Sequence, residues 1–378
     1  MIILFHGAFE HVGCLKGKRW YRDTDNNKLC LFKPQRNVRG NKRIFCANHY
    51  GELVGYLLAN NADIPACKVE LVQLSKYFPD RQKARYGNPE EKKGCITYKE
   101  KNGQLKPGSN IIEGEKINRE NSDLFEELLK DEKNIDAFDN IEVIFKSIEL
   151  LYQRVYADVM PSDAIKEKIQ SEKARMIQMM VFDCLYGNND RHDGNWSFIY
   201  NKDNGLTDIN LYPLYDNERV LGLYESQDTI ERILNRSDFD EYTSELLFSR
   251  MRVPGEKKKY STYKDVLTYL LKNYPEVTSR EISNNLNSNT KETVKRMLEE
   301  CEGLPQCYID FGSKLYETRY NFAKELIQRF STQNKYNSGY KNSNVDYLVI
   351  NIPNGISYNN RSKYETEKKD NAIEFPSV

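Results

Sequence analysis

Residues 185–195 read Leu-Tyr-Gly-Asn-Asn-Asp-Arg-His-Asp-Gly-Asn. This stretch brings a carboxylate (Asp190), an imidazole (His192) and a side-chain amide (Asn195) close together in the sequence. Such a set is typical of a loop that orients a hydroxyl group and a metal ion during phosphoryl transfer. A hydrogen-bonded polar turn after a helix is the alternative interpretation. The segments on either side help to decide between the two.

These flanking segments predict a helix before the stretch and a hairpin after it. Apolar residues recur at helical spacing from Ile165 to Leu185. Gly187 stands where the helix would end, because glycine reaches the left-handed backbone conformation at low cost. An extended run at 196–200, a turn-rich segment and a second extended run ending at Asp216 follow. This order matches a phosphotransferase catalytic loop followed by a metal-binding aspartate.

The composition indicates hydrophobic cores under a highly charged surface. Of the 378 residues, 39% are hydrophobic and 30% charged, and the formal net charge is zero. We expect two or three domains, and the neutral balance argues against a dedicated nucleic-acid-binding or membrane-surface protein. No apolar stretch approaches the roughly 20 residues of a membrane helix. Eight cysteines without a CxxC pair predict reduced, buried thiols in a cytoplasmic protein.

The first 33 residues predict strands, at 2–5, 20–21 and 28–33. Gly13 and Gly17 bracket a small loop with basic residues around it. The backbone amides of such a loop can cover phosphates. A plain hairpin turn explains the two glycines equally well.

A lysine–glutamate ion pair is predicted between a strand and the helix that follows it. Lys33 ends an apolar strand, and Glu52 is the only acidic residue of the helix predicted over 44–61. Kinases use such a pair to hold the α- and β-phosphates of ATP. The alternative is a surface charge at a strand end and an ordinary helical glutamate.

Two further strands are predicted over 69–74 and 95–98, with a charged insertion at 79–93 between them. The run 111–115 then leads out of the sheet. In a two-lobed kinase the junction between the lobes lies here, and the backbone of its residues would bind adenine. The residues concerned are Glu113, Gly114 and Glu115. A simple linker is the alternative.

The pattern becomes helical from about Ser122 onward. A stripe of apolar residues from Ile144 to Val159 repeats at three and four residues, which predicts a core-facing helix. The segment 217–228 has few apolar residues, so we expect it to be mobile. Further helices are predicted over 263–273, 290–301 and 309–330.

Three regions follow from these patterns. Residues 1–117 would form an N-lobe, and residues 118–333 a helical C-lobe that carries the catalytic loop. Residues 334–378 are rich in Asn, Ser, Tyr and Lys, and we expect this polar tail to be disordered apart from an apolar run at 345–351.

The motifs resemble those of the HipA-like kinase family, and most closely its small stand-alone members. They are Leu-Phe-Lys33-Pro, Gly51-Glu52-Leu-Val, the stretch 185–195 and Tyr-Pro-Leu-Tyr-Asp216. The resemblance implies an α+β, two-lobed protein-kinase-like fold, with a small β-rich N-lobe that has one main helix and a larger α-helical C-lobe. It also implies ATP-dependent phosphorylation of serine or threonine by a bacterial cytoplasmic protein, including phosphorylation of the kinase itself. Delivery into a host cell stays open.

The same resemblance implies a role for each site residue. Asp190 would be the catalytic base, with His192 and Asn195 beside it. Asn195 and Asp216 would bind Mg²⁺, and Lys33 would bind ATP. The phosphates of the nucleotide would lie along His192, Asp193, Gly194, Asn195, Tyr215 and Asp216.

Two departures from the family limit what is carried over. No serine or threonine precedes Thr24, so we expect no inhibitory phosphorylation of the loop between Gly13 and Gly17. We expect no counterpart before Gly13 of the extra N-terminal domain with which full-length family members contact a DNA-binding partner. We therefore expect no stable nucleic-acid complex.

Two other functions stay open. Phosphoinositide kinases also carry an Asp-Arg-His-x-x-Asn loop and a later metal aspartate, so a lipid or small-molecule kinase fits the motif. Between Asp216 and Arg250, however, acidic residues outnumber the arginines, which would repel anionic headgroups and favour a basic protein substrate. A catalytically silent binding module is the other alternative, and ATP binding without Asp190-dependent turnover would support it.

Overall fold

The computed structural model describes residues 9–15, 18–23, 28–35, 46–73, 93–98, 110–114, 116–117, 139–203, 206–246, 250–255 and 261–338. By its contacts the chain divides into a unit of residues 1–332 and a second unit of residues 333–378. Several expectations lie outside the described residues. They concern the strand at 2–5, most of the insertion at 79–93, Gly17, Glu115 and the polar tail beyond Ser338.

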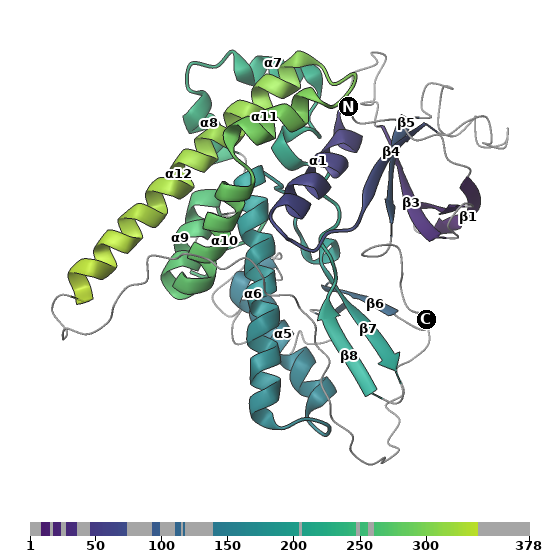
Figure 1. The fold of residues 1–378 in the computed structure, drawn as a ribbon, viewed down its shortest axis with the longest axis vertical. Helices are drawn as coiled ribbons and strands as arrows, with labels where there is room; N and C mark the ends of the chain where they lie inside the picture. Colours follow the sequence, from purple (N-terminus) through teal and green to yellow (C-terminus); the bar gives the residue numbers. More distant parts are fainter. Residues whose placement is uncertain are drawn as a thin grey trace. The chain divides into compact units, whose positions relative to one another are not determined.

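An antiparallel five-stranded sheet forms the first part of the fold, in the order β1-β2-β3-β5-β4. Its strands are β1 (Phe9–Leu15), β2 (Lys18–Asp23), β3 (Lys28–Pro34), β4 (Val69–Gln73) and β5 (Lys93–Tyr98). Helix α1 (Asn48–Asn61) packs against β4 and β5 (Figure 1). Strands β2 to β5 and the helix agree with the sequence-based predictions, although α1 begins four residues later than expected. Strand β1 was not predicted, because a loop was expected from Gly13 to Gly17.

A second, three-stranded sheet joins two distant parts of the chain. β6 (Asn110–Glu113) pairs antiparallel with β7 (Ser197–Asp203), which pairs with β8 (Leu206–Leu211). The β7–β8 hairpin is the one predicted after the catalytic loop. Its pairing with β6 was not predicted, because nothing local in the sequence marks which strand a short apolar run will join.

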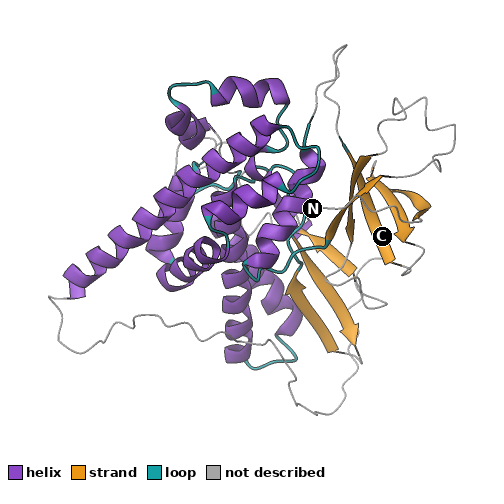
Figure 2. Ribbon diagram, turned by 45° about the horizontal axis from the view of Figure 1, so that its top comes forward, coloured by secondary structure: helices purple, strands orange, loops and turns teal. Residues whose placement is uncertain are grey.

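Helices make up the remainder of the described chain, and Figure 2 shows them gathered beside the strands. The long helix α6 packs against α5, α9, α10 and β8. The helices are α5 (Ile141–Tyr156), α6 (Ser162–Tyr186), α7 (Gln227–Leu234), α8 (Phe239–Leu246), α9 (Tyr263–Asn273), α10 (Pro275–Ser288), α11 (Lys291–Glu299) and α12 (Gln306–Ser338). One hydrophobic cluster runs from α1 through α5 and α6 to α12. The last helix extends past residue 334, where disorder was expected.

Local sequence determines where helix α5 begins and which of its faces is buried. The side chain of Asn140 accepts the N–H of Glu142 at 2.9 Å and so caps the first turn. Ile144 and Ile148 lie on the buried face, as the apolar stripe predicted. Val159, which the same stripe included, lies beyond the end of the helix and is 61% exposed. That part of the prediction was wrong.

The segment 217–228 is packed rather than loose. Val220, Leu221 and Leu223 are fully buried, and a short 3-10 turn, η5 (Val220–Gly222), contacts α1 and α6. The expectation of a mobile segment was wrong. A few apolar residues are enough to hold a segment in place when all of them point into the core.

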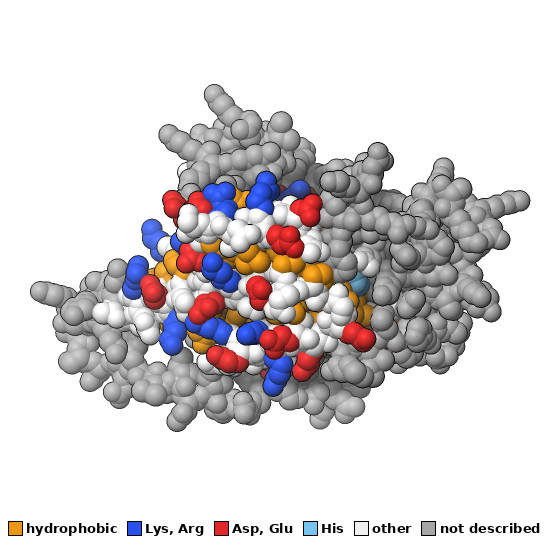
Figure 3. All heavy atoms as spheres, turned by 90° about the horizontal axis from the view of Figure 1, so that it is seen from above, with side chains coloured by type: hydrophobic (Ala, Val, Ile, Leu, Met, Phe, Trp, Pro, Cys, Tyr) orange, Lys and Arg blue, Asp and Glu red, His pale blue; other side chains and the backbone are white. Residues whose placement is uncertain are grey.

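Surface features agree with the composition. Acidic and basic side chains are interspersed on the face shown in Figure 3. Within the described residues, no helix has the length and apolar character needed to cross a membrane. The described cysteines are all free, and all but Cys307 are buried.

Candidate active site

The candidate site begins where helix α6 ends. Gly187 adopts a left-handed conformation with a φ of 76°, as the sequence predicted for a helix C-cap. The N–H groups of Gly187 and Asn188 both donate to the carbonyl of Asp183, at 2.9 and 3.1 Å. The chain therefore leaves the helix in a fixed direction, and the loop with Asp190 follows at once.

A tight turn fixes the second half of this loop. His192 precedes the 3-10 turn η4 (Asp193–Asn195), and its Nδ1 accepts the N–H of Gly194 at 3.0 Å. The side-chain amide of Asn195 donates to the carbonyl of Asp190 at 2.6 Å. His192 thus braces the loop, and the amide oxygen of Asn195 is the side-chain atom that can still take a cation.

Arg191 points inward and ties the loop to the helix before it. Its guanidinium, 1% exposed, donates to both carboxylate oxygens of Asp183, at 2.9 and 3.1 Å. Burial alone would lower the pKa of Arg191, but the Asp183 carboxylate raises it above its ordinary value. Burial raises the pKa of Asp183, and the guanidinium of Arg191 opposes that shift. The two groups meet in the bidentate geometry that makes charge-assisted hydrogen bonds strong.

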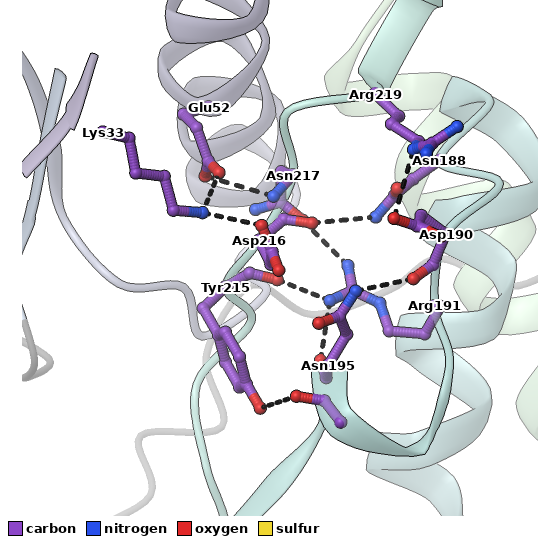
Figure 4. Close-up of polar contacts among 11 residues, drawn as sticks. Lys33, Glu52, Asn188, Asp190, Arg191, Asn195, Tyr215, Asp216, Asn217 and Arg219 are labelled. Carbon is purple, nitrogen blue, oxygen red and sulfur yellow. Dashed lines mark hydrogen bonds and ion pairs between the residues drawn. The ribbon is translucent and has the colours of Figure 1, made fainter. Parts of the chain in front are cut away.

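The same guanidinium reaches the segment around Asp216. It donates to the carbonyls of Asn195 and Tyr215 and, at 2.8 Å, to the side-chain oxygen of Asn217. Figure 4 shows Arg191 at the centre of these contacts. One buried side chain thus joins the loop of Asp190 and Asn195 to the predicted metal-binding segment.

Asp216 meets the predicted lysine–glutamate pair. Lys33 donates to the carboxylate of Glu52 and, at 2.6 Å, to Oδ1 of Asp216 (Figure 4). The other oxygen of Glu52 accepts the N–H of Asn217 at 3.1 Å. Asp216 has a φ of 58°, a conformation uncommon outside glycine, asparagine and aspartate. The structure therefore brings Lys33, Glu52 and Asp216 together. The pair of Lys33 and Glu52 was predicted from the sequence, whereas the contact of Lys33 with Asp216 was not.

Electrostatics keep this lysine charged. Burial by itself would lower the pKa of Lys33, but the carboxylates of Glu52 and Asp216 outweigh burial and raise it well above its usual value. Burial raises the pKa of Glu52, which is completely inaccessible to solvent, and the ammonium of Lys33 opposes that shift. The result is a fixed positive charge near the end of the central strand β3.

Two glycines of α1 allow this close approach. A Cβ atom added at Gly51 would collide with the carbonyl oxygen of Glu218. One added at Gly55 would lie 2.5 Å from Cβ of Asn217. Because these positions carry no side chain, the backbone after Asp216 lies directly on α1, and Glu52 between them reaches Lys33.

A cation could be held by oxygen atoms that lie near Lys33. Glu52, Asp216 and Glu218 each present a carboxylate oxygen within 4.8 Å of the others. Carboxylate and amide oxygens are the ligands that Mg²⁺ prefers. The donor set of Asp216 with the amide oxygen of Asn195 fits this ion, and Glu218 is a nearby carboxylate that the sequence reasoning missed.

Asp190 lies at the other side of the site and contacts two arginines. Its Oδ2 is 3.2 Å from Nε of Arg219, and its Oδ1 is 3.1 Å from Nε of Arg250. Neither arginine was predicted as a site residue. Arg219 follows Asp216 closely, which is a usable signal, whereas nothing near Arg250 in the sequence points to Asp190.

The other predicted site residues belong to strands or form backbone hydrogen bonds. Gly13 lies within β1, paired with Trp20 next to a shift in register, rather than in a loop. The N–H of Gly114 donates to the carbonyl of Trp196 at 3.0 Å, so it is not available to adenine. Glu113 ends β6 opposite Ser197.

Asp193 belongs to the turn η4, and Tyr215 contacts that turn. The hydroxyl of Tyr215 is 2.7 Å from Oγ of Ser197 and donates to the carbonyl of Gly194 at 3.2 Å. Asp193 begins the turn η4 beside His192. In the structure, Tyr215 braces the turn that carries Asn195.

Comparison with solved structures identifies the fold. A crystal structure of the Helicobacter pylori proinflammatory kinase CtkA superposes with a TM-score of 0.64, at 14% sequence identity, over 88% of this chain and 99% of that one. The chain has a two-lobed kinase-like fold. This match confirms the fold that was expected from the sequence.

Other comparisons add little. The Shewanella oneidensis MR-1 toxin–antitoxin complex of HipA, HipB and operator DNA matches with a TM-score of 0.44 and 13% identity, over 85% of this chain and 64% of that one. No protein-family model and no curated protein matches the sequence.

Proposed function

We propose that this chain is a protein kinase that transfers the terminal phosphoryl group of ATP to a serine or threonine hydroxyl. The observation that carries the proposal is the network in which Arg191 joins the loop of Asp190 and Asn195 to the segment of Asp216. Asp216 in turn contacts Lys33 of the five-stranded sheet. Phosphoryl transfer depends mainly on positioning and on neutralised charge, and a network of this kind supplies both.

Each residue has a distinct part in this proposal. Lys33, kept charged and oriented by Glu52, would hold the α- and β-phosphates. Asp216 and Asn195 would hold Mg²⁺, which neutralises phosphate charge when bound. Asp190 would accept the proton of the attacking hydroxyl. His192 acts on the loop itself, since its Nδ1 caps the turn that carries Asn195.

The test is turnover of Mg-ATP by the purified chain, measured as ADP release and as label incorporated from γ-labelled ATP. Asp190→Asn and Asp216→Asn should each reduce both signals by a factor of about 100 or more. Circular dichroism would confirm that the variants fold. Equal turnover by the Asp190 variant would contradict the proposal, and ATP binding without any turnover would indicate a silent binding module.

Self-modification gives a second readout that needs no external substrate. Ser226 and Thr229 lie downstream of Asp216, and the side chain of Ser226 caps helix α7 by accepting the N–H of Thr229. Together with Tyr224 these are the first sites to examine by mass spectrometry after incubation with Mg-ATP. We expect modification in the wild type and none in the Asp190 variant.

A further inference from the structure

Two guanidinium groups share the carboxylate of Asp190. Arg219 lies 3.2 Å from one oxygen and Arg250 lies 3.1 Å from the other. Among the described residues, neither arginine forms an ion pair with a second carboxylate. The side chain of Arg219 is 26% exposed and that of Arg250 is 43% exposed. The carboxylate is therefore reached from solvent past two positive charges.

Arg219 is held by its surroundings, and Arg250 lies next to a fixed segment. The guanidinium of Arg219 lies 4.2 Å from the ring centroid of Tyr224, and its Nη1 donates to the side chain of Asn189 at 3.4 Å. Arg250 precedes a segment fixed by backbone hydrogen bonds, in which Arg252 donates to the carbonyl of Asp139 at 3.0 Å. Two separate parts of the chain thus direct positive charge to one carboxylate.

The acceptor hydroxyl must come within hydrogen-bonding distance of Asp190 if that carboxylate is to take its proton. At least one arginine then loses contact with Asp190. A guanidinium left without a partner in a partly buried site is costly, whereas a carboxylate on the incoming chain would accept its hydrogen bonds. A lysine or arginine on the incoming chain would instead meet two like charges.

We propose that Arg219 and Arg250 select protein acceptors in which an aspartate or glutamate lies next to the hydroxyl that is phosphorylated. This inference rests on the kinase function proposed above. It reverses the preference for basic substrates that the count of charges between Asp216 and Arg250 suggested. That count includes acidic residues such as Asp238, which pairs with Arg236 away from the loop.

A lipid headgroup is the less favoured source of negative charge. Membrane binding requires a cluster of basic residues or an exposed apolar face. Among the described residues, Val159 is the exposed large hydrophobic side chain, and basic and acidic groups are mixed on the face shown in Figure 3. An acidic peptide needs only the two arginines.

Three serine peptides that differ only in the flanking residues (glutamate, glutamine or lysine) provide the test, with Mg-ATP and the full chain. We expect the wild-type kcat/KM to be about tenfold higher for the glutamate peptide than for the glutamine peptide. Arg219→Gln and Arg250→Gln should each reduce this ratio. Arg250→Glu should shift the preference toward the lysine peptide. Arg236→Gln is the matched control, since its guanidinium pairs with Asp238 on an exposed surface.

The other outcomes are distinguishable from this one. Equal kcat/KM for the three peptides, with ADP release intact, would overturn the inference and leave the kinase function standing. Weaker ATP binding in the arginine variants with an unchanged peptide ratio would assign the arginines to the nucleotide and overturn it as well. Phosphorylation of phosphatidylinositol vesicles but of no peptide would overturn the inference, because the acceptor would then be a lipid. Absence of any ADP release would overturn both proposals.

Discussion

Gly55 of helix α1 lies directly against Asn217, so closely that a Cβ atom added to the glycine would be 2.5 Å from that of the asparagine. One turn earlier, Gly51 lies in the same way on the backbone of Glu218. Glu52 stands between the two glycines and contacts Lys33. The charge that would hold the nucleotide therefore depends on the absence of side chains on one face of this helix.

The first prediction concerns this contact. Gly55→Ala should destabilise the fold by about 1 to 3 kcal/mol, because the added methyl group overlaps Asn217. The gain in helix propensity, about 1 kcal/mol, would offset only part of this. Urea unfolding measures the change, and ATP affinity should fall in parallel. Asn60→Ala, at an exposed position of the same helix, is the control and should change stability by less than about 0.5 kcal/mol.

A second prediction separates the lysine from the residue that orients it. Lys33→Met removes the charge on the phosphates and should lower kcat/KM for ATP by a factor of about 100 or more. Glu52→Gln leaves the lysine in place and should cost about tenfold, as is usual for groups that only orient a ligand. The measurement is ADP release at varied ATP. If Glu52→Gln were the more damaging variant, Lys33 would have been assigned the wrong partner.

Arg191 supplies a third prediction, about stability. Arg191→Met leaves the buried carboxylate of Asp183 without its partner and should cost about 3 to 5 kcal/mol. Combining it with Asp183→Leu should recover part of that loss, because no buried charge then remains. Denaturant unfolding of the two single variants and the double variant gives the coupling. Additive losses would show that the ion pair does not hold the loop.

The fourth prediction tests the metal. Chelation of divalent ions should abolish label transfer, and Mg²⁺ should restore it. Mg-ATP at about 100 times its Kd should stabilise the wild type by about 2.7 kcal/mol. Asp216→Asn should lose most of this effect while folding normally, since asparagine tolerates the left-handed conformation that Asp216 adopts. Thermal unfolding with and without Mg-ATP measures both. Full stabilisation of the Asp216→Asn variant by Mg-ATP would show that Asp216 does not bind the ion.

Much of the site could be predicted because its residues belong to local patterns. Gly187 follows from the end of an apolar helical repeat, and Lys33 and Asp216 each end an extended run. The contact between Lys33 and Glu52 was predicted from the order of strand and helix. These inferences need only the local sequence pattern and the known requirements of phosphoryl transfer.

The parts that were missed depend on the direction in which a side chain points. Nothing in the sequence shows that Arg191 is buried while Arg219 and Arg250 meet at Asp190. Counting charges along 216–250 predicted a basic acceptor, although the charges nearest to Asp190 are positive. Nothing near Gly114 in the sequence shows that it packs on Trp196 and donates its N–H to the carbonyl of that residue. Such facts arise from segments far apart in the chain.

The pairing of β6 with β7 limits where insertions and deletions can be tolerated during evolution. β6 is the strand by which the chain leaves the first sheet, and the N–H of Gly114 just after it donates to the carbonyl of Trp196, one residue after Asn195. Deleting or inserting one residue in β6 would turn its side chains to the opposite face and drag the neighbouring turn out of place. Insertions and deletions in related chains should therefore be absent from this strand, even where the neighbouring loops vary in length.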